Sequence, residues 1–490
     1  MKKANLVVFT QNLKLDSLGE ILTEINKDYS TVLLTSHCLF ENEIESIEGM
    51  IGNVETYTFA SLMSDADMEK IDIDAYKEEH EDIGEYYRRI KVKKNELIIS
   101  RILEKIDPIV KLILCDDLGI DLGSWLKAGF RKVELEYYHK TEVAESENKT
   151  AYFQAIKRFA REPVYSTRYN GKKYVFYGSM NRIGYRLNSE FKRDRLENWL
   201  FIATIVSRKL FNKSICRKNV KHISTLHESL KWRFPKLSNY EVGLIQDGYL
   251  PPNYSSLYLK FINPNEHYYA WDTLGMQVFH NQNIPVKMLP LRKKLYLPEP
   301  ELKRVKSVLC IASGAGDWTA MKNRSDEDMM ILAFIEVAKR HPEIKFVYRC
   351  HPNWVYPAHQ GMNSINRVAE YFSWLNLPNL VLSGNIPSTN LDNFQLSISR
   401  NSLAEDLKEV DIVFGEHSIS MVDAAFKRIP FASVNVTGRR DFFCGMTSLG
   451  FPHCESIEDI ESVLIECGKQ KFDDAYKAAV EKYNRMTDEE

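Results

Sequence analysis

Short apolar strands that alternate with helical stretches are the feature that most constrains how this chain folds. Asn5–Phe9 and Ser30–Thr35 have the Val, Leu and Phe content of buried strands, and Val54–Phe59 predicts a third. A charged stretch with helical character, 65–104, then precedes another apolar strand, Ile109–Cys115. Strand and helix in alternation predict a parallel sheet with helices on both faces.

The alternation starts again after a run rich in proline and charge, 289–300, where we place a domain linker. The expected elements of the second half are the strand Ser307–Ala312, the helix Asp326–Arg340, a strand ending at His351, and strands at Leu380–Leu382, Asp411–Phe414 and Phe431–Val434. A chain of 490 residues is too long for a single hydrophobic core. We therefore expect a first domain at 1–295, a second at 301–475 and a terminal helix or tail at 476–490.

Residues 141–236 interrupt this rhythm and predict a basic, mainly helical insertion. A hairpin is expected between Tyr165 and Tyr177, around Asn170 and Gly171. From Lys157 to Lys236 there are 20 Lys and Arg against 5 Asp and Glu, although the net charge of the chain is −2. This excess favours contact with an anionic glycan, a lipid-linked acceptor or the inner face of a membrane. A solvated insertion that balances the acidic stretch 65–85 is the alternative.

The composition is that of a soluble globular protein, with 44% hydrophobic and 27% charged residues. The eight cysteines include no pair with CxxC spacing, so the sequence predicts neither a zinc site nor a redox dithiol. We find no signal peptide and no apolar run near the roughly 20 residues that span a bilayer. The sequence therefore predicts a cytoplasmic protein, with peripheral membrane contact through Lys157–Lys236 as an option. No nucleic-acid-binding motif is present.

Arg349-Cys-His351-Pro352 ends an apolar strand, where open α/β sheets hold their ligands. The proline fixes φ and removes a hydrogen-bond donor, so the strand must stop there. An imidazole and a guanidinium can both donate to a phosphate oxygen. Arg349, His351 and Pro352 are therefore candidate nucleotide-binding residues. The alternative is a strand-end histidine that hydrogen-bonds a backbone carbonyl.

The stretch Gly415-Glu416-His-Ser418-Ile-Ser420 repeats this arrangement after the strand that begins at Asp411. Ser418 suits the N-cap of a helix running to Lys427, whose free N–H groups and dipole favour an anion. Glu416, Ser418 and Ser420 are thus further candidates for the nucleotide site. A helix cap without a ligand would explain Ser418 equally well.

A glycine turn follows the first strand of the second half, at Ser313-Gly314-Ala-Gly316. It is neither a P-loop nor a full GxGxxG motif. Ser313, Gly314 and Gly316 fit a turn at which the backbone approaches a ligand, and a plain strand-to-helix turn about equally.

Two acidic positions follow strands of the first half and compete for the role of general base. Gln246-Asp247-Gly248 sets a carboxylate beside a glycine that permits close approach of a substrate. Asp116-Asp117 is the competing pair, in which one carboxylate can raise the pKa of the other. Either position also suits an Asx-turn or a cap.

The order of these motifs on two consecutive α/β halves resembles the GT-B glycosyltransferases. It is most similar to the bacterial sialyltransferase-like and capsule-polysaccharide transferases that use CMP-activated acidic sugars. The resemblance implies two Rossmann-like domains facing a central cleft, with Asp247 as the base, His351 and Pro352 as the His-Pro motif, and Ser418 with Ser420 as the serine motif. This chain departs from the family pattern in two places, because it has Gln246 where the family has an acid and Ser-Ile-Ser instead of adjacent serines.

The expected function is transfer of a sugar, such as an acidic nonulosonic sugar, from a CMP-linked or other nucleotide donor to a surface glycan such as capsule or lipopolysaccharide. Asp247 would deprotonate the acceptor, while His351 and Ser418 stabilise the leaving phosphate without a metal or other cofactor. One alternative is a glycerol- or ribitol-phosphate polymer transferase, which shares the fold and the His-Pro and Ser pattern. The other, from a different class, is a non-catalytic protein that binds a nucleotide sugar or a polyanion.

Overall fold

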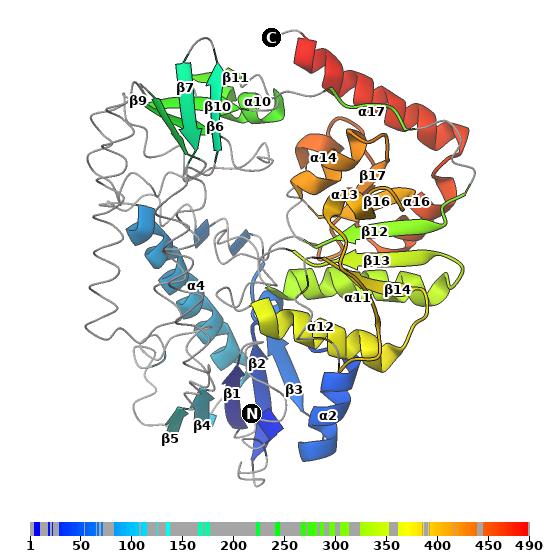
Figure 1. Cartoon of the computed structure of the whole chain (residues 1–490). Helices are drawn as coiled ribbons and strands as arrows, with labels where there is room; N and C mark the ends of the chain where they lie inside the picture. Colours follow the sequence, from blue (N-terminus) through cyan, green and yellow to red (C-terminus); the bar gives the residue numbers. More distant parts are fainter. Residues whose placement is uncertain are drawn as a thin grey trace. The chain divides into compact units, whose positions relative to one another are not determined.

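The computed structural model describes part of the chain (Figure 1). The described residues are 4–9, 18, 19, 22, 29–52, 54–64, 66, 67, 70, 71, 83–106, 109–114, 125, 134–137, 165–169, 172–176, 222–225, 241–245, 266–270, 273–281, 285–288, 294–298, 304–312, 324–351, 361–384, 386, 391, 393–416, 418–438 and 444–488. The chain forms two compact units. One comprises Met1–Thr141, Tyr296–Asp441 and Gly450–Lys477, and the other Glu142–Leu295, Phe442–Leu449 and Ala478–Glu490.

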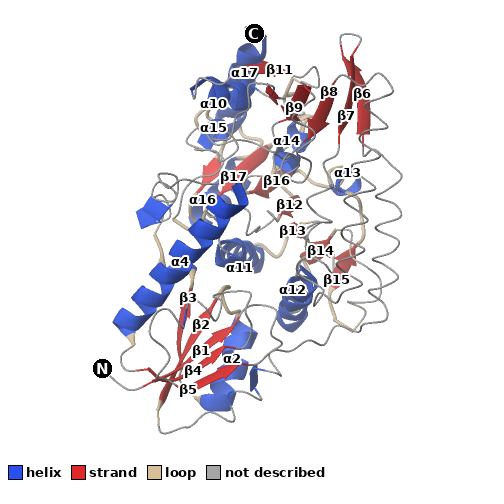
Figure 2. Cartoon of the chain, turned by 90° about the vertical axis from the view of Figure 1, so that its left-hand side faces the viewer, coloured by secondary structure: helices blue, strands red, loops and turns tan. Residues whose placement is uncertain are grey.

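The first unit contains a five-stranded sheet near the amino terminus, with all its strands parallel (Figure 2). Its strands are β1 (Ala4–Phe9), β2 (Ser30–Thr35), β3 (Glu55–Thr58), β4 (Ile109–Leu114) and β5 (Glu134–Tyr137). They lie in the order β3-β2-β1-β4-β5. The described helices of this half are α2 (Glu41–Ile51), the short 3₁₀ turn η1 (Ala60–Leu62) and α4 (Ile83–Lys105). All six residues of β1 are buried, as a central parallel strand requires.

The same unit contains a second parallel sheet of seven strands. These are β12 (Ser307–Ile311), β13 (Lys345–Arg349), β14 (Leu380–Ser383), β15 (Ser397–Ser399), β16 (Ile412–Gly415), β17 (Phe431–Val434) and β18 (His453–Cys454). Their order is β15-β14-β13-β12-β16-β17-β18. The helices between and after them are α11 (Arg324–Arg340), α12 (Gly361–Leu375), α13 (Leu403–Asp406), α14 (Ile419–Ala425), α15 (Cys444–Thr447), α16 (Ile457–Glu466) and α17 (Gln470–Asp488).

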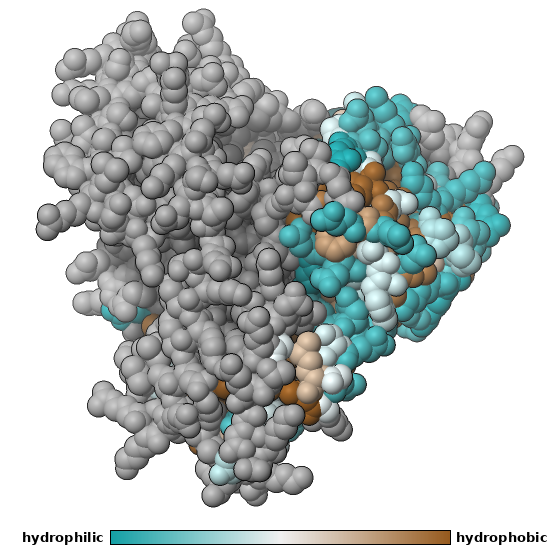
Figure 3. All heavy atoms as spheres, turned by 60° about the horizontal axis from the view of Figure 1, so that its bottom comes forward, coloured by the Kyte–Doolittle hydropathy of each residue, from teal (hydrophilic) through white to brown (hydrophobic). Residues whose placement is uncertain are grey.

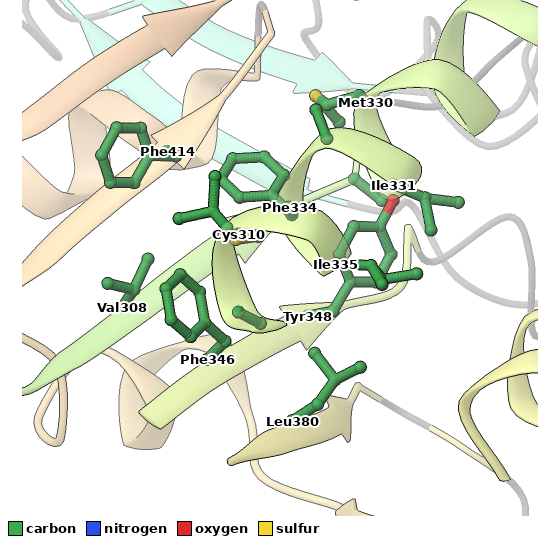
Figure 4. Packing of buried hydrophobic residues seen from close by; sticks show 14 of the residues in the cluster. Val308, Cys310, Met330, Ile331, Phe334, Ile335, Phe346, Tyr348, Leu380 and Phe414 are labelled. Carbon is green, nitrogen blue, oxygen red and sulfur yellow. The ribbon is translucent and has the colours of Figure 1, made fainter. Parts of the chain in front are cut away.

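Helix α11 covers the central strands of the seven-stranded sheet with an apolar face (Figure 4). Phe334 of α11 meets Phe414 of β16 edge to face, with 5.7 Å between the ring centroids. Full burial of each such side chain contributes about 1.5–3 kcal/mol. Lys339 and Arg340 lie in the last turn of α11, where the helix dipole stabilises positive charge. His341-Pro342 follows the end of the helix. Burial raises the pKa of the Cys310 thiol on β12 well above its usual value.

The second unit contains a six-stranded mixed sheet, the helix α10 (Thr273–Asn281), the short helix α15 and the part of α17 that begins at Ala478. Its strands are β6 (Tyr165–Tyr169), β7 (Lys172–Phe176), β8 (His222–Thr225), β9 (Glu241–Ile245), β10 (Glu266–Ala270) and β11 (Val286–Met288). They lie side by side in chain order, from β11 to β6. The antiparallel pair β6 and β7 confirms the hairpin predicted around Asn170 and Gly171.

The predicted α/β class is confirmed, because two parallel sheets carry the Rossmann-like strand pattern. Of the insertion 141–236, the structure describes only the strands β6, β7 and β8, so its predicted helical character and the contacts of Lys157–Lys236 fall largely outside the described residues. The domain boundaries at 295, 301 and 475 stay a prediction.

The described surface in Figure 3 is mainly hydrophilic, with small apolar areas between polar ones. Among all the described residues, the large hydrophobic side chains that are exposed are Ile44, Tyr296, Leu297, Trp374 and Ile465. Among the described helices, none has the length and apolar character needed to cross a bilayer.

Candidate functional site

The strand order of the seven-stranded sheet reverses between β12 and β16. From β12 the chain first adds β13, β14 and β15 on one side, and then β16, β17 and β18 on the other. Ile311 of β12 is in register with Arg349 on one side and Gly415 on the other. Open α/β sheets bind ligands outside the carboxyl ends of the strands at such a reversal. The carboxyl ends of β12, β13 and β16 are therefore the place to look for a site.

The segments singled out in the sequence follow these three strands. His351 comes two residues after β13, and Glu416 to Ser420 come directly after β16. Since one strand separates β13 from β16, their ends are about 10 Å apart at the usual strand spacing. Ser313, Gly314 and Gly316 follow β12 in the sequence but lie outside the described residues, as does Pro352.

The backbone leading to His351 is fixed by hydrogen bonds that extend the sheet beyond the strands. The Cys350 N–H donates to the Ser383 carbonyl at 2.9 Å, and the Ala312 N–H donates to the Arg349 carbonyl at 3.0 Å. His351 itself is half-buried. This backbone places His351 at the carboxyl end of β13, where the sequence led us to expect it. Its role in binding a ligand stays a prediction.

Arg349 is held by neighbouring protein groups. Its Nη1 donates to the Asp406 carboxylate at 2.5 Å and to the Asn401 carbonyl at 2.9 Å. The same carboxylate oxygen accepts a bond of 2.6 Å from the Ser383 hydroxyl. Only 2% of the Asp406 side chain is exposed, and 13% of the Arg349 side chain. These contacts tie α13 to the ends of β13 and β14, so Arg349 has a structural role whether or not it also binds a nucleotide.

The turn after β16 depends on a close approach of α14 to the sheet. A Cβ added at Gly415 would lie 2.6 Å from Met421 Sδ and 3.3 Å from the Ile311 carbonyl oxygen. Glycine is therefore the residue that fits between strand and helix here. Glu416, the next residue, is buried, with 5% of it exposed.

Ser418 is the N-cap of α14, as predicted from the sequence. Its φ of −79° and ψ of 134° are extended, and its hydroxyl accepts a bond of 3.2 Å from the Ser420 N–H. The helix ends at Ala425, two residues before the predicted end at Lys427. With only seven residues, α14 has a weaker dipole than a long helix.

The two candidate bases follow strands of different sheets, and both lie outside the described residues. Asp116 and Asp117 follow β4, and the order of the five-stranded sheet reverses between β1 and β4. Asp247 follows β9, in the six-stranded sheet, whose strands are in chain order without a reversal.

Sequence reasoning missed two sets of polar residues at carboxyl ends. Asp406 was one, although Ser402 and Glu405 form a capping box that marks the start of its helix. His37 was the other. It follows β2, it is 2% exposed, and its Nδ1 lies 2.8 Å from the Thr35 hydroxyl. Its position two residues after Thr35, a β-branched residue, gave no signal of a site.

No protein-family model matches the sequence, and no curated protein matches it. Solved structures give weak likenesses. The glycotransferase of kitacinnamycin aligns with 99% of this chain and 95% of its own, at 9% identity and a TM-score of 0.26. MurG of Acinetobacter baumannii aligns with 81% of this chain and 90% of its own, at 8% identity and a TM-score of 0.30. The UDP-GlcNAc 2-epimerase of Neisseria meningitidis, bound to UDP-GlcNAc, aligns with 99% of this chain and 100% of its own, at 10% identity and a TM-score of 0.23. At such TM-scores these likenesses support no conclusion about this chain.

Among the described residues, no three His, Cys, Asp or Glu side chains are grouped so that they could hold a metal ion. The predicted independence of metal and cofactor stays a prediction.

Proposed function

We propose that this chain is a glycosyltransferase of the GT-B type that uses a nucleotide-activated sugar. The observation that carries the proposal is the strand reversal between β12 and β16, because all three motif-bearing segments of the second half follow β12, β13 or β16. A topological reversal is where open α/β sheets bind nucleotides. The motif order Asp247, His351, Ser418 supports the same conclusion independently through its resemblance to sialyltransferase-like and capsule-polysaccharide transferases.

The donor would lie across the carboxyl ends of β12, β13 and β16. His351 and the hydroxyls of Ser418 and Ser420 would contact the phosphate, with the turn at Gly314 and Gly316 beside it. Because α14 has only seven residues, the hydroxyls and the imidazole would contribute more than the helix dipole. As the sugar leaves, negative charge develops on the phosphate, and fixed donors of this kind stabilise it without reorganisation.

A proton acceptor for the incoming hydroxyl completes the proposed mechanism. The family resemblance favours Asp247. The strand reversal between β1 and β4 favours Asp116 and Asp117 instead, because it gives the five-stranded sheet its own ligand position. Loss of a general base typically slows transfer by about 10²–10⁴-fold. Asp247→Asn and the double substitution Asp116→Asn/Asp117→Asn separate the two, since the true base should be needed for turnover but not for nucleotide binding.

The direct test is thermal unfolding of the full chain with CMP, CDP, UDP and GDP. A ligand that binds only the folded state raises the melting temperature. At a ligand concentration of 100 times its Kd, the free energy of unfolding increases by about 2.7 kcal/mol. Stabilisation by CMP would support the sialyltransferase-like donor, and stabilisation by CDP would favour the glycerol- or ribitol-phosphate type. If none of the four changes the melting temperature at millimolar concentration, the nucleotide-sugar proposal is wrong.

A further inference from the structure

A buried ionic cluster joins the two α/β halves of the first unit. Arg367 of α12, 9% exposed, pairs with Asp328 of α11 and with Glu43 of α2. The distance from Arg367 Nη1 to Glu43 Oε2 is 3.2 Å, and the same nitrogen donates to the Cys38 carbonyl at 3.2 Å. Glu43 and Arg367 are 324 positions apart in the chain. One guanidinium thus connects the segment after β2 to two helices of the seven-stranded sheet.

An aromatic side chain crosses the same seam. Phe40, the N-cap residue of α2, lies under the Arg367 guanidinium at 4.1 Å from its ring centroid. Its ring also stacks on Tyr371, with 4.4 Å between centroids and 12° between planes. Arg367 and Tyr371 are one helical turn apart on α12, so both side chains can contact Phe40, which belongs to the other half. Phe40 is fully buried.

Among the described residues, each half has an apolar cluster that is largely its own. The first half has an apolar cluster of its own, which includes Val7, Leu33 and Ile113. The cluster under α11 and α12 is built from the second half, and of the described residues that form it, Phe40 alone comes from the first. At the rim, Lys339 of α11 pairs with Glu41 of α2 at 3.6 Å, where both side chains are partly exposed and the pair contributes little.

We propose that Arg367, Asp328, Glu43 and Phe40 form a latch that holds α2 on α11 and α12, and that can be released without unfolding either sheet. Removing Arg367 would leave two buried carboxylates without their counter-charge, which is far costlier than losing a surface pair. Because each half keeps its own apolar cluster, that cost would fall on the contact between them. The latch is independent of the proposed transferase activity, since none of its residues belongs to the candidate nucleotide site.

Hydrogen exchange measured by mass spectrometry on the full chain tests the latch through the variants Arg367→Met and Phe40→Ala. In both, the amides of α2 should exchange about a hundredfold faster, whereas those of β12 and β13 should keep their protection. Arg340→Met is the matched control, because Arg340 is a partly exposed arginine of α11 that pairs with Glu336 and Glu461 within the second half. It should leave α2 unchanged.

Two results would overturn the latch. Protection of α2 that is the same in both variants as in the wild type would mean that the contact does not hold it. Loss of protection in β12 and β13 to the same extent as in α2 would mean that the cluster is part of one indivisible core.

Discussion

Arg349 and Asp406 form an ion pair at the carboxyl end of β13, with 2.5 Å between Nη1 and Oδ2 and with both side chains largely buried. The Ser383 hydroxyl and the Asn401 carbonyl complete this group of contacts. The pair fixes the end of the strand that leads to His351. Arg349, which the sequence led us to expect in contact with the nucleotide, thus also holds α13 against the end of β13 beside the candidate site.

Asp406→Asn should destabilise the protein by about 3–5 kcal/mol, because it leaves a buried guanidinium without its counter-charge. The double variant Arg349→Met/Asp406→Leu should lose less than Asp406→Asn alone, since both charges are then absent. Urea unfolding of the two variants and the wild type measures this difference. A double variant that is no more stable than the single one would argue against a mutual pair.

Gly415→Ala should destabilise the protein by about 1–3 kcal/mol, because its Cβ overlaps Met421 Sδ. In a Met421→Ala background the same change should cost less, as the overlapping atom is gone. Gly49→Ala is the control. Nothing lies within 4 Å of a Cβ at Gly49, which is exposed on α2, and the change should stabilise by about 0.4–1 kcal/mol. Equal effects of Gly415→Ala in both backgrounds would rule out this overlap as the cause.

Burial raises the pKa of Glu43 above its usual value, although the nearby Arg367 opposes the shift. The folded state therefore holds the Glu43 proton more tightly than the unfolded state does. Stability from this group is present below the unfolded pKa near 4.5 and is lost as pH rises through the folded pKa. The stability of Glu43→Gln relative to wild type should therefore improve as the pH rises from 4.5 through the pKa of Glu43 in the folded state. A pH-independent difference between the two would contradict the shift.

Asp459 should show the opposite sign. The Ser456 hydroxyl and the Glu455 N–H hydrogen-bond its carboxylate and lower its pKa below the usual 3.8. Its contribution to stability is present above pH 3.8 and is lost as pH falls through the folded pKa. Chemical unfolding of Asp459→Asn should show a deficit at neutral pH that shrinks toward pH 2. A deficit that stays constant with pH would contradict this assignment.

The central strands could be predicted from the sequence because burial on both faces gives them continuous apolar runs. Ser307–Ile311 and Phe431–Val434 are wholly buried and lie where their Val, Leu, Ile and Phe content predicts. The edge strands β15 and β18 could not, since Ser397–Ser399 and His453–Cys454 are two or three residues long with polar members. Only pairing with a neighbour makes such segments strands.

The site was predictable where a local rule governs it. Ser418 was assigned as an N-cap from its residue type and the strand before it, and the structure confirms the cap. The partner of Arg349 could not be predicted, because Asp406 is 57 positions away in the chain. The parallel pairing of β13, β14 and β15 brings α13 close to Arg349. The same holds for the contact of Phe40 with Arg367, which follows from tertiary packing alone.

Calorimetric titration with the nucleotide that most raises the melting temperature tests the central claim most directly. We predict that the wild type binds, that His351→Ala weakens binding at least about tenfold, the loss expected for a charge-assisted contact worth about 1.5–3 kcal/mol, and that His341→Ala binds like the wild type. His341 precedes β13 at the opposite edge of the sheet, where it pairs with Glu461. Equal affinity of all three proteins, or no binding by any of them, would contradict a nucleotide site at the carboxyl ends of β12, β13 and β16.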